Sequence, residues 1–168
     1  QFSNNQKSID SEVQLADSGY GQGQVLVNPV HLASIYSAFV NKGSMVRPYL
    51  LYKKKPEPEY WMKDAFSEKT AEIIKKDLIQ VIEHPDGTVH GARPPGVKLA
   101  GKTGTAEIKA SKSDTSGTEL GWFGVFTAGK REKEPWLLIT MAEDVKERGG
   151  SGYVVRKTLP VIKAKENE

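Results

Sequence analysis

Cysteine is absent from the 168-residue chain, so disulfides and thiolate metal sites are excluded. No apolar run approaches the roughly 18 residues of a membrane-spanning helix, and no signal peptide opens the chain. The chain has no large excess of one charge, because 24 basic and 21 acidic residues give a net charge of +3. That balance is too small to favour a nucleic-acid partner. The chain has the composition of one soluble globular domain, and we expect neither a metal nor a cofactor.

The most informative stretch is Val97–Ile108, in which one lysine, two threonines and two glycines fall within five positions. Lys102–Thr105, called the K-T-G-T segment below, is similar to the strand motif of penicillin-binding proteins and serine β-lactamases. Residues 96–103 also match the phosphate loop G-x-x-x-x-G-K-[ST]. These two chemistries predict opposite structures, a strand in the first case and the start of a helix in the second.

The flanking residues favour the strand. A phosphate loop follows a buried strand and opens a helix whose free amides bind the phosphates. Here Pro94-Pro95 precedes the glycine, and proline cannot donate to a central ladder. The residues after the motif, 110–119, are polar and have no helical apolar period. A nucleotide-binding protein therefore stays a remote alternative, as does an ordinary edge strand that happens to contain a lysine.

Two helices are predicted from capping residues and apolar periodicity. The first spans residues 28–41, capped by Asn28 and followed by Gly43, which suits a left-handed helix end. Ser67 caps the second, and His84-Pro85 ends it. Three glycines within residues 19–23 predict tight turns.

Three strands and a last helix complete the expected fold. Val97–Ile108, Gly121–Thr127 and Trp136–Ala142 are consecutive apolar segments and should pair antiparallel. The third should be central and covered on both faces, because it is almost continuously apolar. Ser151–Lys165 has helical periodicity, and Pro160 should kink or split it. The fold class is α/β of the α+β type, an antiparallel sheet with helices packed on its faces.

In the order of its motifs, the chain resembles the C-terminal half of the transpeptidase domain of class B penicillin-binding proteins. The sequences of residues 15–23 and 101–109 most resemble those of low-affinity penicillin-binding proteins, the type involved in β-lactam resistance. The resemblance extends over most of the chain from about Leu15 onward. The matching pieces are Tyr20-Gly21-Gln22-Gly23, Asn28-Pro29 with the following helix, Gly87-Thr88, Leu99–Glu107, Gly121-Trp122-Phe123 and Gly149-Gly150.

The chain departs from the family pattern at the nucleophile. Family members acylate a serine in S-x-x-K, and no serine here has a lysine three residues later. Ser3-Asn4-Asn5 matches the second motif, S-x-N, only by its letters, because the resemblance places that motif upstream of Gln1. The chain also begins without methionine. We therefore expect residues 1–168 to be the C-terminal portion of a transpeptidase domain whose N-terminal portion carries the nucleophile.

The resemblance implies roles for the K-T-G-T segment. Lys102 supplies positive charge beside the reacting centre, and the hydroxyls of Thr103 and Thr105, on one face of the strand, bind the substrate carboxylate. Gly104 leaves the backbone open for pairing with the ligand. The amide of Thr105 belongs to the oxyanion hole. Tyr20 and Gln22 border the groove, although turn geometry explains them nearly as well.

The implied parent is a serine-type peptidoglycan D,D-transpeptidase that crosslinks stem peptides ending in D-Ala-D-Ala and binds β-lactams covalently. Its expected partners are these ligands and the N-terminal half of its own domain. It would lie outside the cytoplasm, anchored to the bacterial membrane by a segment missing here. This chain alone should be inactive. Because a central strand needs neighbours from the missing half, we expect an isolated structure to show extra apolar exposure or chain-chain association on one sheet face. A β-lactam sensor or a β-lactamase-like relative is the alternative, since the strand motif is shared.

Overall fold

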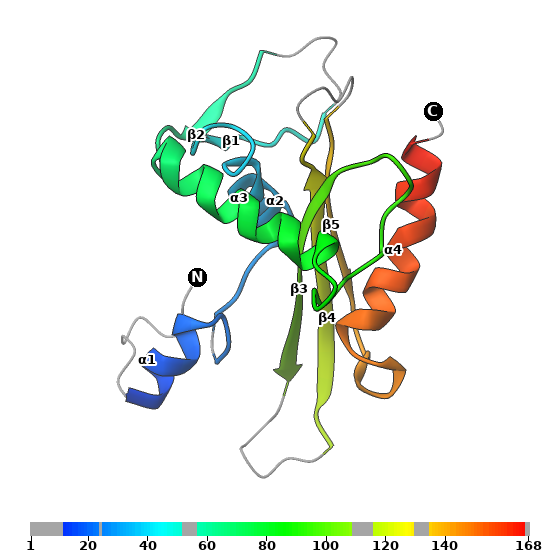
Figure 1. Cartoon of the computed structure of the whole chain (residues 1–168). Coiled ribbons are helices and arrows are strands. Elements are labelled where there is room, and N and C mark those ends of the chain that lie inside the picture. Colours follow the sequence, from blue (N-terminus) through cyan, green and yellow to red (C-terminus); the bar gives the residue numbers. More distant parts are fainter. Residues whose placement is uncertain (1–11, 24, 52–56, 109–115, 130–134, 167–168) are drawn as a thin grey trace.

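The computed structural model describes residues 12–23, 25–51, 57–108, 116–129 and 135–166 (Figure 1). Within this part of the chain, no helix is both long and apolar enough to cross a membrane. The helices are α1 (Glu12–Gly19), α2 (Pro29–Ser37), α3 (Glu68–Glu83), the short 3-10 helix η1 (Lys146–Arg148) and α4 (Ser151–Glu166). The strands are β1 (Met45–Val46), β2 (Tyr60–Met62), β3 (Leu99–Ile108), β4 (Thr118–Thr127) and β5 (Leu137–Ala142).

The larger sheet has the antiparallel order β3-β4-β5, which confirms three consecutive antiparallel strands. The prediction that the third strand is central is wrong, because β4 lies between the other two. The prediction that this strand is covered on both faces is confirmed, because both α2 and α4 contact β5. The short strands β1 and β2 form a separate antiparallel pair.

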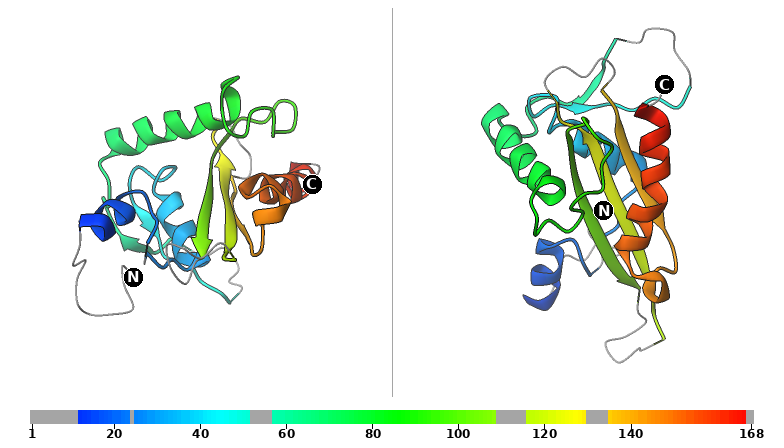
Figure 2. Two further views of the ribbon diagram at one scale, coloured as in Figure 1. Left: turned by 90° about the horizontal axis from the view of Figure 1, so that it is seen from below. Right: turned by 45° about the vertical axis from the view of Figure 1, so that its right-hand side comes forward.

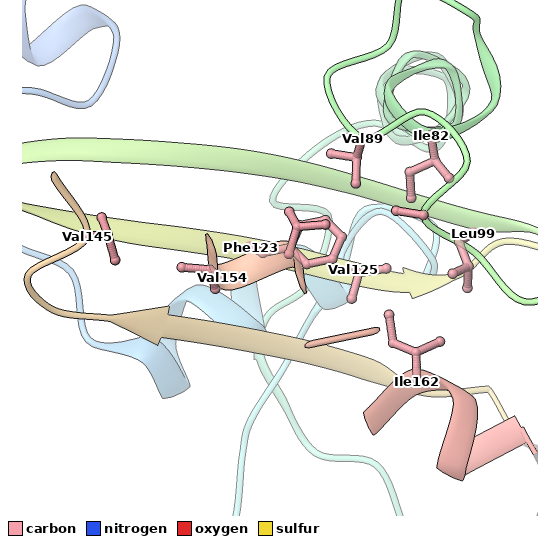
Figure 3. Packing of buried hydrophobic residues seen from close by; sticks show 10 residues of the cluster. Ile82, Val89, Leu99, Phe123, Val125, Val145, Val154 and Ile162 are labelled. Carbon is pink, nitrogen blue, oxygen red and sulfur yellow. The ribbon is translucent and has the colours of Figure 1, made fainter. Parts of the chain in front are cut away.

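The two faces of the sheet are covered by different helices (Figures 1 and 2). On one face, Phe123 and Val125 pack with Val154 and Ile162 of α4 (Figure 3). On the other face, Phe126 packs with the ring of Tyr36 from α2. Side chains alternate along β4, so the adjacent residues Val125 and Phe126 belong to opposite clusters. The structure confirms the predicted fold class.

Helix α3 lies alongside β3 and contributes to both clusters. Its residues Leu78 and Ile79 pack with Phe126, whereas Ile82 packs with Phe123. Ser67 caps the helix as predicted, its hydroxyl accepting a hydrogen bond from the amide of Thr70 at 3.1 Å. The helix ends at Glu83 with His84 as its C-cap, which confirms the predicted stop at His84-Pro85.

Helix α2 begins as predicted and ends early. The side chain of Asn28 accepts a hydrogen bond from the amide of Val30 at 2.9 Å. The helix stops at Ser37 rather than at residue 41, because the following amides bond to carbonyls three residues back. Gly43 has the expected left-handed conformation, with φ of 91°. A Cβ there would lie 1.9 Å from the carbonyl oxygen of Phe66.

Pro160 does not split the last helix, which runs without interruption from Ser151 to Glu166. Buried residues on both sides of the proline, including Val154 and Ile162, pack against the sheet. This packing offsets the local loss of a backbone hydrogen bond.

Helix α1, strand β2 and the 3-10 helix η1 were not predicted. Helix α1 has no buried residue and therefore shows no apolar stripe in its sequence, and β2 and η1 are each only three residues long. The predicted turns around Gly21 and Gly23 are confirmed, with φ of 81° and 70°. Ser3-Asn4-Asn5 lies outside the described residues.

The close approach of α4 to the sheet gives a test. A Cβ at Gly121 would lie 2.7 Å from Val154 Cγ2 and 3.1 Å from Val145 Cγ2, so Gly121→Ala should lower the free energy of unfolding by about 1–3 kcal/mol. Gly104→Ala is the matched control, because its Cβ would meet only Trp122 Cβ at 3.7 Å. Denaturant unfolding measures both variants. Equal stability of the two would contradict the packing described here.

Candidate functional site

The K-T-G-T segment lies in the edge strand β3, which confirms the predicted strand. The chain continues extended to Ile108, and no helix begins at Lys102 or Thr103. The phosphate-loop alternative is therefore wrong, because that site requires a helix N-terminus at this point. The pairing of β3 with β4 uses only one of its two backbone edges.

The hydrogen-bond register decides which backbone groups face the open edge. The carbonyl of Lys98 accepts from the amide of Ala128 at 2.8 Å, so Lys98 faces β4. Backbone groups alternate along a strand, and the amide and carbonyl of one residue point to the same side. Thr103 and Thr105 therefore direct theirs away from β4. Within the described part of the chain, the Thr105 amide has no acceptor.

Side chains alternate between the faces in the same way. Lys102 is opposite Gly124, on the face of α2, where the Tyr36 ring lies against Gly124. Thr103 and Thr105 share the face of α4. The long side chain of Lys102 nevertheless reaches the open edge, where its ammonium donates to the carbonyl of Thr103 at 2.7 Å. The Lys102 ammonium and the Thr103 carbonyl therefore lie together at the open edge of β3.

Thr105 is held from two sides. Its hydroxyl accepts from the amide of Ser151, at the start of α4, at 3.3 Å. The hydroxyl proton is therefore available for donation elsewhere. Its carbonyl accepts from the side-chain amide Nε2 of Gln22 at 2.8 Å. Gln22, predicted to border the groove, is thus in direct contact with the K-T-G-T segment.

Tyr20 is placed differently from Gln22. Its side chain is 70% exposed, and its hydroxyl donates to Asp17 Oδ1 at 2.9 Å. That hydrogen bond and the charge of Asp17 raise the pKa of Tyr20, with a smaller contribution from the charge of Glu107. In the described residues, no hydrogen bond joins Tyr20 to β3.

The sequence did not identify Ser151 or Asp17 as members of this site. Ser151 acts through its backbone amide, which any residue supplies, and it lies 46 positions from Thr105. Asp17 orients the loop through its carbonyl, which accepts from the amide of Gln22 at 2.9 Å. No motif letter encodes either contact.

Apolar side chains remain exposed on the sheet face that carries α2. Ile108 is 49% exposed and Met141 is 37% exposed, and the register places both on this face. Trp122, from the same face, is half-buried and lies outside both core clusters. This agrees with the expected apolar exposure on one sheet face.

The antiparallel sheet, its two helical layers and the K-T-G-T edge strand are features of the class that contains penicillin-binding proteins and serine β-lactamases. The Burkholderia pseudomallei penicillin-binding protein 3 transpeptidase domain has this fold, with a TM-score of 0.70 and 23% identity over 93% of this chain and 47% of that one. Residues 1–162 match the family described as the penicillin binding protein transpeptidase domain. The chain belongs to this family.

Two curated relatives are also similar. Penicillin-binding protein 3 of Bacillus subtilis is 42% identical over 149 residues, which cover 89% of this chain and 22% of that protein. The probable peptidoglycan D,D-transpeptidase PbpC of Pseudomonas aeruginosa is 31% identical over 156 residues, which cover 92% of this chain and 26% of that protein. The chain spans about a quarter of the length of these relatives.

The contact between Thr105 and α4 can be tested by stability. Thr105→Val keeps the shape of the side chain but removes the acceptor for the Ser151 amide, so the free energy of unfolding should fall by about 0.5–1.5 kcal/mol. Thr103→Val is the control, because its hydroxyl has no hydrogen bond within the described residues. If urea unfolding shows the same loss of free energy for both variants, the hydrogen bond between Thr105 and the Ser151 amide does not stabilise the fold.

Proposed function

We propose that the chain supplies the K-T-G-T strand of a serine-type peptidoglycan D,D-transpeptidase. The observation that carries the proposal is the open edge of β3, where the Thr105 amide faces away from the sheet beside the Lys102 ammonium. Family membership and the D,D-transpeptidase name of a relative support the same activity.

In the proposed reaction, a serine hydroxyl attacks the carbonyl carbon between the two D-alanines of a stem peptide. The serine oxygen–carbon bond forms, the peptide C–N bond breaks, and the serine proton leaves on the terminal D-alanine amine. An amine of a neighbouring stem peptide then displaces the serine from the acyl-enzyme. A β-lactam reacts in the same way, but its ring C–N bond opens and the leaving amine remains attached.

The described residues fit the electrostatic needs of this reaction. The Thr105 amide donates to the oxygen that becomes negative in the tetrahedral intermediate, and removing one such donor typically lowers the rate by roughly 10²–10³. Lys102 and the hydroxyls of Thr103 and Thr105 bind the terminal carboxylate, since a charge-assisted hydrogen bond is stronger than a neutral one. Gly104 keeps a side chain away from the paired backbone.

The nucleophile comes from outside these residues, because the chain contains no S-x-x-K sequence. We propose that residues 1–168 are the C-terminal portion of the domain and that the N-terminal portion packs on the exposed sheet face around Met141 and Ile108. The parent would act outside the cytoplasm, held at the membrane by a preceding segment. From the sequences of residues 15–23 and 101–109, we assign the parent to the low-affinity penicillin-binding proteins. Its affinity for β-lactams tests this assignment.

A β-lactam sensor or a β-lactamase-like protein would use the same strand. Crosslinking of stem peptides by the full-length parent separates the transpeptidase from both, because only the transpeptidase passes the acyl group to an amine acceptor.

Lys102→Ala in the full-length parent should slow acylation by a fluorescent penicillin roughly ten- to hundredfold, the loss expected for a hydrogen bond to a charged group. The control is Lys76→Ala, which removes an exposed lysine from α3. Labelling at the wild-type rate in the Lys102 variant would remove this lysine from the site.

Gly104→Ala should lower the acylation rate while leaving the stability of the protein almost unchanged. The added methyl makes only an ordinary contact with Trp122, so the unfolding midpoint should change little. Acylation should nevertheless fall by about tenfold, because the methyl stands beside the backbone that pairs with the ligand. Stopped-flow acylation and thermal unfolding of the same preparation measure the two quantities. An unchanged acylation rate would exclude a ligand that lies close to the strand at Gly104.

A further inference from the structure

The side chain of Gln22 occupies a backbone acceptor at the open edge of β3. Its Nε2 donates to the carbonyl of Thr105 at 2.8 Å in a partly buried contact between residues 83 positions apart. A turn holds the loop in place: the Gln22 amide donates to the Asp17 carbonyl, and the flanking Gly21 and Gly23 have positive φ angles. The turn from Asp17 to Gly23 therefore positions the side chain of Gln22 against β3.

An extended ligand would need the same carbonyl. When two strands pair antiparallel, a hydrogen-bonded residue exchanges both its amide and its carbonyl with its partner. Thr105 can offer its amide, but its carbonyl already accepts from Gln22. The preceding outward carbonyl, that of Thr103, already accepts from the Lys102 ammonium. Both of these outward carbonyls are thus engaged, whereas the Thr105 amide has no acceptor within the described residues.

We propose that Gln22 is a specificity-determining residue whose amide competes with a ligand N–H for the Thr105 carbonyl. A stem peptide, or a β-lactam with an amide side chain, must displace Gln22 to pair fully with β3. A β-lactam without an N–H at that position binds without displacing it. The inference rests on the proposed transpeptidase function. Engaged acceptors also protect an otherwise open edge strand from pairing with another chain.

The test compares two β-lactams on the full-length parent. One is a penicillin with a side-chain amide N–H, and the other is an amidinopenicillin, which has no N–H there. Gln22→Met keeps the length of the side chain but cannot donate. It should increase the second-order acylation rate of the amide penicillin roughly three- to tenfold, through tighter initial binding, and leave that of the amidinopenicillin unchanged.

Gln80→Met on α3 makes the same chemical change at an exposed position and should alter neither rate. Thermal unfolding checks that all three proteins are equally folded. An equal change for both β-lactams, no change, or a slower reaction with the amide penicillin would overturn the competition. If the wild-type parent is not acylated by either compound, the proposed function fails as well, whereas acylation with no Gln22 effect overturns only this inference.

Discussion

The organisation of this domain depends on one-sided pairing of β3. Its hydrogen bonds to β4 fix the register, and that register turns the amides and carbonyls of Thr103 and Thr105 outward. A one-residue slip would direct these groups into the sheet and reverse the faces of every side chain. The position of the K-T-G-T segment is therefore set by strand pairing, with the help of the long ladder from Leu99 to Ile108.

Packing on the two faces keeps that register in place. Gly121 lets α4 approach β4 closely, and the start of the same helix donates an amide to the hydroxyl of Thr105. On the other face, Gly124 accommodates the ring of Tyr36. Burial of this ring raises the pKa of Tyr36, as expected for a phenol whose charged form would lose its hydration. The residues that stabilise the sheet thus also orient the edge.

Much of the fold could be predicted from local sequence signals. Asn28 and Ser67 cap helices by short-range chemistry, and the three strand segments are apolar enough to be recognised. The order of the strands could not be predicted from hydrophobicity, because β5 is apolar through its contacts with helices on both faces rather than through a central position. Pro160 did not split the last helix, because the buried residues on both sides of it pack against the sheet.

The candidate site, like the fold, could be predicted only in part from the sequence. Strand alternation predicts that Thr103 and Thr105 share a face. The contacts of Thr105 with Gln22 and Ser151 join residues 83 and 46 positions apart and depend on the register and on a glycine turn. These contacts are visible only in the folded chain.

We propose that the outward amide of Thr105 donates to the oxygen of the reacting carbonyl. Amide hydrogen exchange of Thr105 in the full-length parent, measured before and after acylation by penicillin, tests this role. We expect this amide to exchange at least about tenfold more slowly in the acyl-enzyme, because it gains a hydrogen bond. Unchanged exchange at Thr105 in a fully acylated protein would exclude the Thr105 amide from the oxyanion hole.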